Sequence, residues 1–153
     1  MKIVKHNLYP HWLVVGMMVL SLLAYLFVCF QFGHELQEPL PEEQRIVIRT
    51  IFYAIAIVTL PITNLIRHIQ LRLNQTMPGN KSAKSRYLLT VIVSMALVES
   101  VGVLGFVMFM LGDDFNTLYI FLGLSALGLY LYRPKEDEYF QVVEALAERA
   151  QNC

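Results

Sequence analysis

Residues 87–112 read YLLTVIVSMALVESVGVLGFVMFMLG, an apolar run that carries a single charged residue, Glu99. A helix needs about 20 mostly apolar residues to cross the hydrocarbon core of a bilayer. The run exceeds that length, so we expect it to form a transmembrane helix with one acid buried inside it.

Three further apolar runs have the length of a spanning helix, for which ~17–25 residues is the usual range. They read WLVVGMMVLSLLAYLFVCFQF at 12–32, TIFYAIAIVTLPITNLI at 50–66 and FNTLYIFLGLSALGLYLY at 115–132. We therefore predict an all-α, polytopic membrane protein in which residues 1–153 form a single four-helix transmembrane domain. The expected helices lie at about 11–32, 46–72, 84–112 and 115–132.

The composition agrees with a membrane protein and argues against several kinds of function. Charged residues make up 16% of the chain, against about 25% in an ordinary soluble domain. The formal net charge is zero, so we expect no nucleic-acid partner. The two cysteines, Cys29 and Cys153, have no metal or redox spacing, and no catalytic set or phosphate-binding glycine loop is present. We expect no enzyme activity, no metal and no cofactor.

The basic residues predict the orientation of the chain. Lysine and arginine are enriched in cytoplasmic loops. Ten of them fall in the two termini and the connection near residues 67–86, whereas only Arg45 and Arg49 fall on the opposite side. The opposite side also carries the acidic loop at 35–43 and the turn Asp113–Asp114. We expect the bacterial inner membrane, four crossings, and cytoplasmic N and C termini.

The segment after the last apolar run predicts a short amphipathic helix at about 135–150. Pro134 and the acids that follow it suit the start of a helix. Two sets of apolar residues have helical spacing, and we expect the first to dock against the bundle: Phe140, Val143 and Ala147, and alternatively Tyr139, Val142 and Leu146.

Glu99 is the residue most indicative of a function. It lies about 13 residues from either end of its run, which is close to the middle of the bilayer. A carboxylate exposed to lipid there costs several kcal/mol, so the group must face the bundle, be protonated or have a partner. It could be a polar clamp between helices, or it could be a site for a proton, a cation or a ligand.

A polar patch on the second run is a candidate partner for this acid. Pro61 removes a backbone hydrogen bond there and frees a carbonyl. With Thr59, Thr63 and Asn64 it forms polar surface at membrane depth, and Ser21 on the first run is another possible partner. Small residues near Glu99, Ala96 and Ser100 among them, allow a neighbouring helix to come close. That neighbour could belong to this bundle or to another subunit.

The stretch 86–111 resembles the second helix of subunit c, the rotor-ring subunit of F-type ATP synthases. In that family an arginine begins the helix and a tetrad like Ala96-Leu97-Val98-Glu99 bears the ion-binding carboxylate. The resemblance implies that Glu99 takes the carboxylate's place and Arg86 that of the arginine. The chain departs from the family elsewhere, because run 50–66 has no glycine and two further runs have no counterpart in a two-helix hairpin.

The second half also resembles an uncharacterised family of small four-helix bacterial membrane proteins. The shared pattern is an arginine-led helix with A-L-x-E, a tight acidic turn, a last helix, and Arg133-Pro134 before an amphipathic tail. This resemblance implies the architecture and no particular activity.

Two functions remain open. We expect a non-enzymatic accessory or interaction subunit whose partners are the lipid bilayer and either other membrane subunits or a second copy. The alternative is a proton- or cation-translocating component that uses Glu99.

Overall fold

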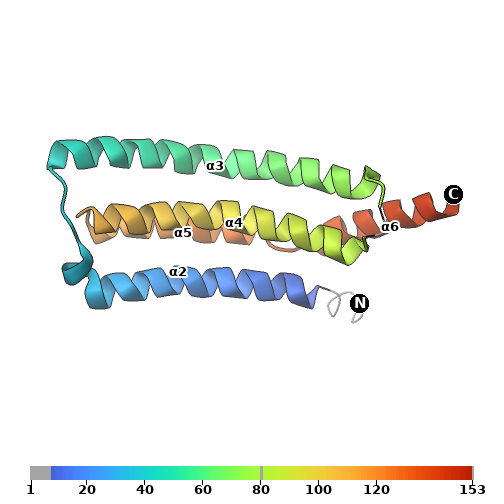
Figure 1. Ribbon diagram of the computed structural model, residues 1–153, viewed down its shortest axis with the longest axis horizontal. Coiled ribbons are helices and arrows are strands. Elements are labelled where there is room, and N and C mark those ends of the chain that lie inside the picture. The colour runs from blue at the N-terminus through green and yellow to red at the C-terminus, as the bar shows by residue number, and fades with distance from the viewer. Residues whose placement is uncertain (1–7, 80, 153) are drawn as a thin grey trace.

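The computed structural model describes residues 8–79 and 81–152, which form five α-helices and no strand within those ranges (Figure 1). The all-helical class is confirmed. The first two helices extend past their apolar runs into polar residues at both ends, and the second continues through Pro61. The helices are α2 (Tyr9–Leu36), α3 (Glu42–Thr76), α4 (Ala83–Met110), α5 (Phe115–Leu131) and α6 (Glu136–Asn152).

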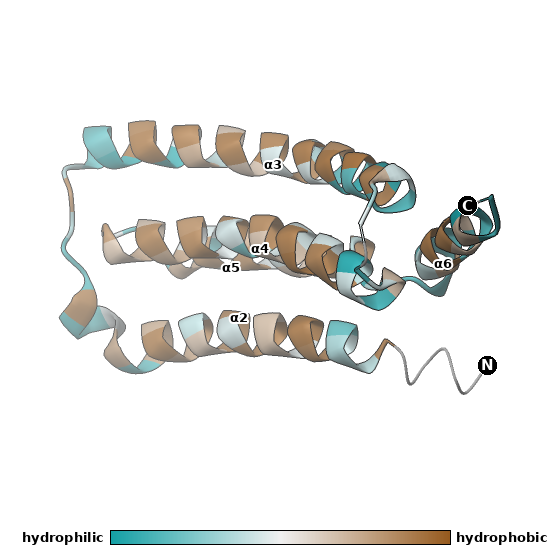
Figure 2. Cartoon of the chain, turned by 45° about the vertical axis from the view of Figure 1, so that its right-hand side comes forward, coloured by the Kyte–Doolittle hydropathy of each residue, from teal (hydrophilic) through white to brown (hydrophobic). Residues whose placement is uncertain are grey.

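Three of these helices, α2, α3 and α4, are long and apolar enough to cross a membrane. Helix α5 has 17 residues, the lower limit for a span. It passes the same test only together with α6, as one span bent by 44°. Figure 2 shows α2 to α5 mostly in brown, with hydrophilic residues gathered toward the helix ends. The architecture is therefore compatible with a membrane protein that has three spanning helices, or four if α5 is counted.

Helix α4 is the centre of the structure. It packs against α2, α3, α5 and α6, and α2 and α3 lie on opposite sides of the α4–α5 pair (Figures 1 and 2). A Cβ atom at Gly105 would overlap Phe121, and one at Gly128 would overlap Val98. The hydroxyl of Ser125 also donates to the Val98 carbonyl at 3.0 Å. Small residues thus let the two backbones approach closely, as is typical of helix contacts in membranes.

At the end of the bundle where α2 ends and α3 begins, a folded cap joins the helices. The backbone N–H of Glu38 donates to the Met110 carbonyl at 2.8 Å, and that of Leu40 to the Leu111 carbonyl at 3.0 Å. Arg45 donates to the Gly112 carbonyl at 2.9 Å. The loop before α3 therefore lies across the tight turn between α4 and α5.

The acidic turn at this end has a basic partner from another helix. Asp113 is 5% exposed and pairs with Arg49 of α3 at 3.2 Å. Gly112 has φ +98°, a left-handed conformation that favours glycine, and an added Cβ would lie 2.8 Å from Pro39 Cα. The turn itself contains no lysine or arginine, but the fold brings Arg49 of α3 to it as a partner for Asp113.

Helix α6 packs against α3 and α4, but not through the stripe that we expected. Tyr139 and Val142 are buried, whereas Phe140 is 42% exposed and Ala147 is exposed. The expectation that Phe140, Val143 and Ala147 form the docking face is therefore wrong for two of the three residues. The alternative set docks because the position of Tyr139 lets its ring reach Tyr87 of α4, with 5.9 Å between ring centroids.

Candidate functional site

One side of α4 is not covered by another helix of the chain. Its exposed residues recur at intervals of three or four, so they share one face of the helix. This face lies between α2 and α3 and points toward the viewer in Figure 1. We call it the open face and define it by Leu89, Ile92, Ala96, Ser100 and Val103.

Glu99 lies at the edge of the open face, on the side of α2. Its side chain is half-buried and lies near the Tyr25 hydroxyl of α2. The Tyr25 ring packs on Phe106 of α4, with 5.4 Å between the ring centroids. The acid is therefore neither sealed in the core nor fully exposed on the surface of the bundle. Tyr25 covers one side of it, and the open face adjoins the other.

The polar patch that we expected lies on α3, which packs on a different side of α4. Thr59 donates to its own helix at the Ile55 carbonyl and Thr63 at the Thr59 carbonyl, both at 2.7 Å. Thr63 is buried, and Pro61 and Asn64 are exposed. Within residues 8–79 and 81–152, no hydrogen bond joins these four side chains to Glu99. The structure brings Glu99 together with Tyr25 instead.

A signal for Tyr25 was present in the sequence. Tyr25 lies 14 residues after the expected helix start at 11, and Glu99 lies 15 residues after the expected helix start at 84. With two connections between them, these two helices run parallel, so the similar offsets place the two side chains at a similar depth. A tyrosine far from either interface has to hydrogen-bond its hydroxyl to a neighbour.

A second polar cluster lies at the opposite end of the bundle from the Asp113 turn, where α6 meets α3 and α4. Arg67 of α3 is 3% exposed and pairs with Glu138 of α6 at 2.9 Å. Its guanidinium also donates to the Tyr132 carbonyl and, at 3.1 Å, to the Arg133 carbonyl. The Tyr87 hydroxyl accepts from the Lys135 backbone N–H at 2.8 Å. In the sequence, Arg67 counted only as one of the ten basic residues that predict the orientation, so its burial was missed.

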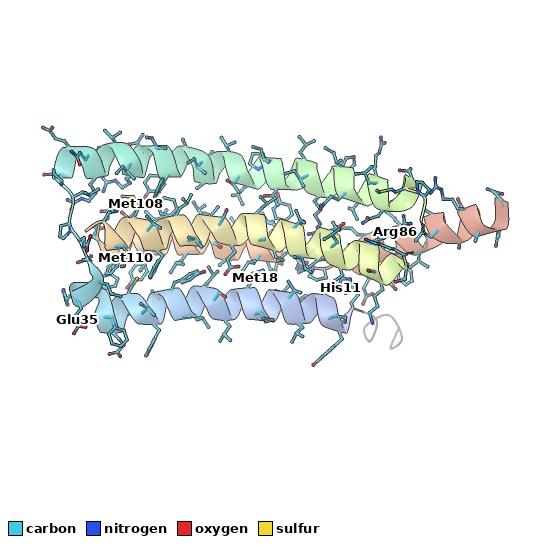
Figure 3. The ribbon with its side chains drawn as sticks, viewed as in Figure 1. His11, Met18, Glu35, Arg86, Met108 and Met110 are labelled. Carbon is cyan, nitrogen blue, oxygen red and sulfur yellow. The ribbon has the colours of Figure 1, made fainter. Side chains whose placement is uncertain are left out.

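His11 of α2 borders this cluster (Figure 3). The side chain is fully buried, and its ring centroid lies 5.2 Å from that of Tyr87 and 6.4 Å from that of Tyr139. Neither ring nitrogen has a hydrogen-bond partner in the part of the chain that the structure describes. In that same part, no three His, Cys, Asp or Glu side chains come close enough to hold a metal ion.

The geometry around Glu99 offers two uses: contact with a further helix along the open face, and proton exchange between Glu99 and Tyr25.

Comparison of the chain with protein-family models, with curated proteins and with solved structures gives no match.

Proposed function

We propose that the chain is a bacterial inner-membrane protein with four spanning helices and cytoplasmic termini, and that it works as a non-enzymatic accessory or interaction subunit. In this proposal α5 crosses the membrane as a short fourth span. The ten basic residues in the termini and the 67–86 connection support the orientation, since they fall on one side of such a bundle.

The observation that carries the proposal is the position of Glu99 beside the open face. An acid at the middle of a bilayer is unfavourable by about 2.5–3.5 kcal/mol even on the mildest scale. A neutral carboxyl has one donor and further acceptor capacity, and Tyr25 supplies a single hydroxyl. Ala96 and Ser100 of the open face are small, so a further helix can approach closely and complete the hydrogen bonding of the acid.

A proton- or cation-translocating component is the alternative. The Glu99–Tyr25 pair favours it, because a carboxyl beside a hydroxyl is an arrangement through which a proton can pass. The resemblance of stretch 86–111 to the ion-carrying helix of subunit c points to the same residue.

Site-specific photocrosslinking in living cells tests the interaction. A benzophenone amino acid at Ser100 places the probe on the open face, and the same probe at Ile120, an exposed residue of α5, is the control. We expect a protein crosslink from Ser100 and only lipid adducts from Ile120. Lipid adducts alone at both positions would show that no helix covers the open face.

Two substitutions at Glu99 distinguish an interaction subunit from a proton- or cation-translocating component. Glu99→Gln keeps the shape and hydrogen-bonding capacity, so it should preserve the Ser100 crosslink, whereas Glu99→Leu should abolish it. An amide cannot release a proton, so under the alternative Glu99→Gln stops proton movement into proteoliposomes that hold a pH-sensitive dye. If Glu99→Gln leaves the crosslink intact and removes such a flux, the translocation function replaces the one proposed.

A further inference from the structure

A cavity of about 550 Å³ lies at the inner end of the α3–α4 hairpin. It is formed by the end of α3, the connection to α4 and the first turns of α4. One end of its lining is polar, with Asn74, Lys81, Ser85 and Arg86, and the other end is apolar, with Leu89 and Ile92. The cavity is thus amphipathic along its length, and its apolar end continues into the open face of α4.

Arg86 gives the polar end of the cavity a fixed positive charge. The side chain is 8% exposed and comes from the first turn of α4 (Figure 3). Its guanidinium donates to the carbonyls of Asn74 at 3.0 Å, Met77 at 2.8 Å and Gly79 at 3.1 Å. With a fourth bond, from Nε to the Lys81 carbonyl at 3.2 Å, these carbonyls occupy four of its five N–H donors but do not neutralise its charge. No carboxylate pairs with Arg86 in the part of the chain that the structure describes.

The surroundings of the cavity add to this charge. Residues 67–98 contain five lysines and arginines and no aspartate or glutamate. Lys81 is exposed at the rim of the cavity. The N-terminus of α4, which Ser82 caps, contributes a further partial positive charge. The polar end is therefore complementary to an anion.

The apolar end of the cavity indicates which anion it takes. Leu89 is 56% exposed and Ile92 is 39% exposed, and both lie on the open face of α4. A small soluble anion would leave this wall without a contact. A phospholipid places its phosphate at the polar end and a fatty-acyl chain along the apolar end, and basic pockets between helices at the cytoplasmic face bind such headgroups.

We propose that this cavity is a binding site for an anionic phospholipid of the inner leaflet, with its headgroup phosphate beside Arg86 and Lys81 and an acyl chain against Leu89 and Ile92. The site does not include Glu99. Its inner-leaflet placement rests on the orientation proposed above, and the acyl chain occupies the Leu89–Ile92 end of the open face, so a partner helix would cover that face from Ala96 onward. The bound lipid would fix the α3–α4 hairpin at the inner membrane surface.

Native mass spectrometry of the full chain in an uncharged detergent tests the proposal. Phosphatidylglycerol and phosphatidylcholine with identical acyl chains are added separately, and the lipid-bound fraction is measured for the parent, Lys81→Gln and Arg72→Gln. Arg72 is the matched control, since it is a nearby exposed base that does not line the cavity. We expect phosphatidylglycerol to bind more tightly than phosphatidylcholine, and Lys81→Gln to weaken it about fivefold while Arg72→Gln leaves it unchanged.

A second variant tests the acyl-chain contact. Leu89→Trp fills the apolar end without touching a charge, and it should lower phosphatidylglycerol binding while the far-UV circular dichroism stays that of the parent. Equal binding of both lipids would overturn the proposal, as would equal losses from Lys81→Gln and Arg72→Gln. Displacement of phosphatidylglycerol by millimolar inorganic phosphate would show that the site takes a soluble anion instead.

Discussion

Removal of the Glu138 carboxylate should destabilise the packing of α6 against the bundle. Its Oε2 accepts a hydrogen bond from Arg67 Nε at 3.0 Å and forms an ion pair with Arg67 Nη2 at 2.9 Å. Glu138→Gln keeps the shape but removes the charge, so it leaves a cation that is 4% exposed without its counter-ion. Breaking a fully buried pair costs about 3–5 kcal/mol, and exposed pairs contribute about 0–1 kcal/mol.

The expected effect lies between these limits. Glu138 is 17% exposed, and Arg67 keeps its bonds to the carbonyls of Tyr132 and Arg133. We therefore expect a loss of about 2 kcal/mol in the free energy that holds α6 closed. In amide hydrogen exchange in detergent, this corresponds to about 30-fold faster exchange across 136–152, with α5 unchanged as an internal reference.

Glu144→Gln is the matched control. It makes the same change of charge on the same helix, at an exposed position. Equal exchange rates of α6 in the two variants would refute the reasoning. The double variant Arg67→Met/Glu138→Leu should recover most of the loss, since an apolar pair of similar volume can replace a buried ion pair. A double-mutant cycle compares this double variant with Arg67→Met alone and Glu138→Leu alone. A coupling free energy near zero between the two substitutions would also count against the ion pair.

Three further predictions follow from the packing and the charges. Gly105→Val should lower the free energy of unfolding by about 1–3 kcal/mol in a denaturant titration, because even a Cβ overlaps the facing helix, whereas Gly123→Val, which has open space around it, should change it little. Gly112→Ala should cost about 1–2 kcal/mol in the same titration, since alanine is strained at φ +98°. Reporter fusions at Gln37 should be active in the periplasm and those at Cys153 in the cytoplasm; a cytoplasmic signal at Gln37 would reverse the proposed orientation.

Hydropathy was sufficient to predict where the helices lie. Long apolar runs can form little else in lipid, so the all-helical class followed from composition. The helix ends did not follow as closely, because polar residues continue a helix without adding to its hydropathy. Helix α3 was expected at 46–72 and spans Glu42–Thr76. The additional turn at its start carries Arg45 toward the α4–α5 turn.

It was harder to predict which side of each helix is buried. Helix α4 is apolar around its whole circumference, so no periodicity shows which side is buried. The depth of Glu99 could be inferred from its position in the run, but its direction depends on how α2 and α3 pack. Helix α6 shows the same limit, because Phe140 and Tyr139 begin two stripes of equal spacing. The contact with Tyr87, remote in sequence, decides between them.

The bonds of Arg86 have a consequence for biogenesis. All of them reach carbonyls between Asn74 and Lys81, at most 12 positions earlier in the chain. The turn of the α3–α4 hairpin can therefore close as soon as Arg86 has been synthesised, before α5 and α6 exist. Once α4 is complete, the two helices can pack together as one unit. Central helix α4 is in this way already joined to α3 when α5 arrives to pack against it.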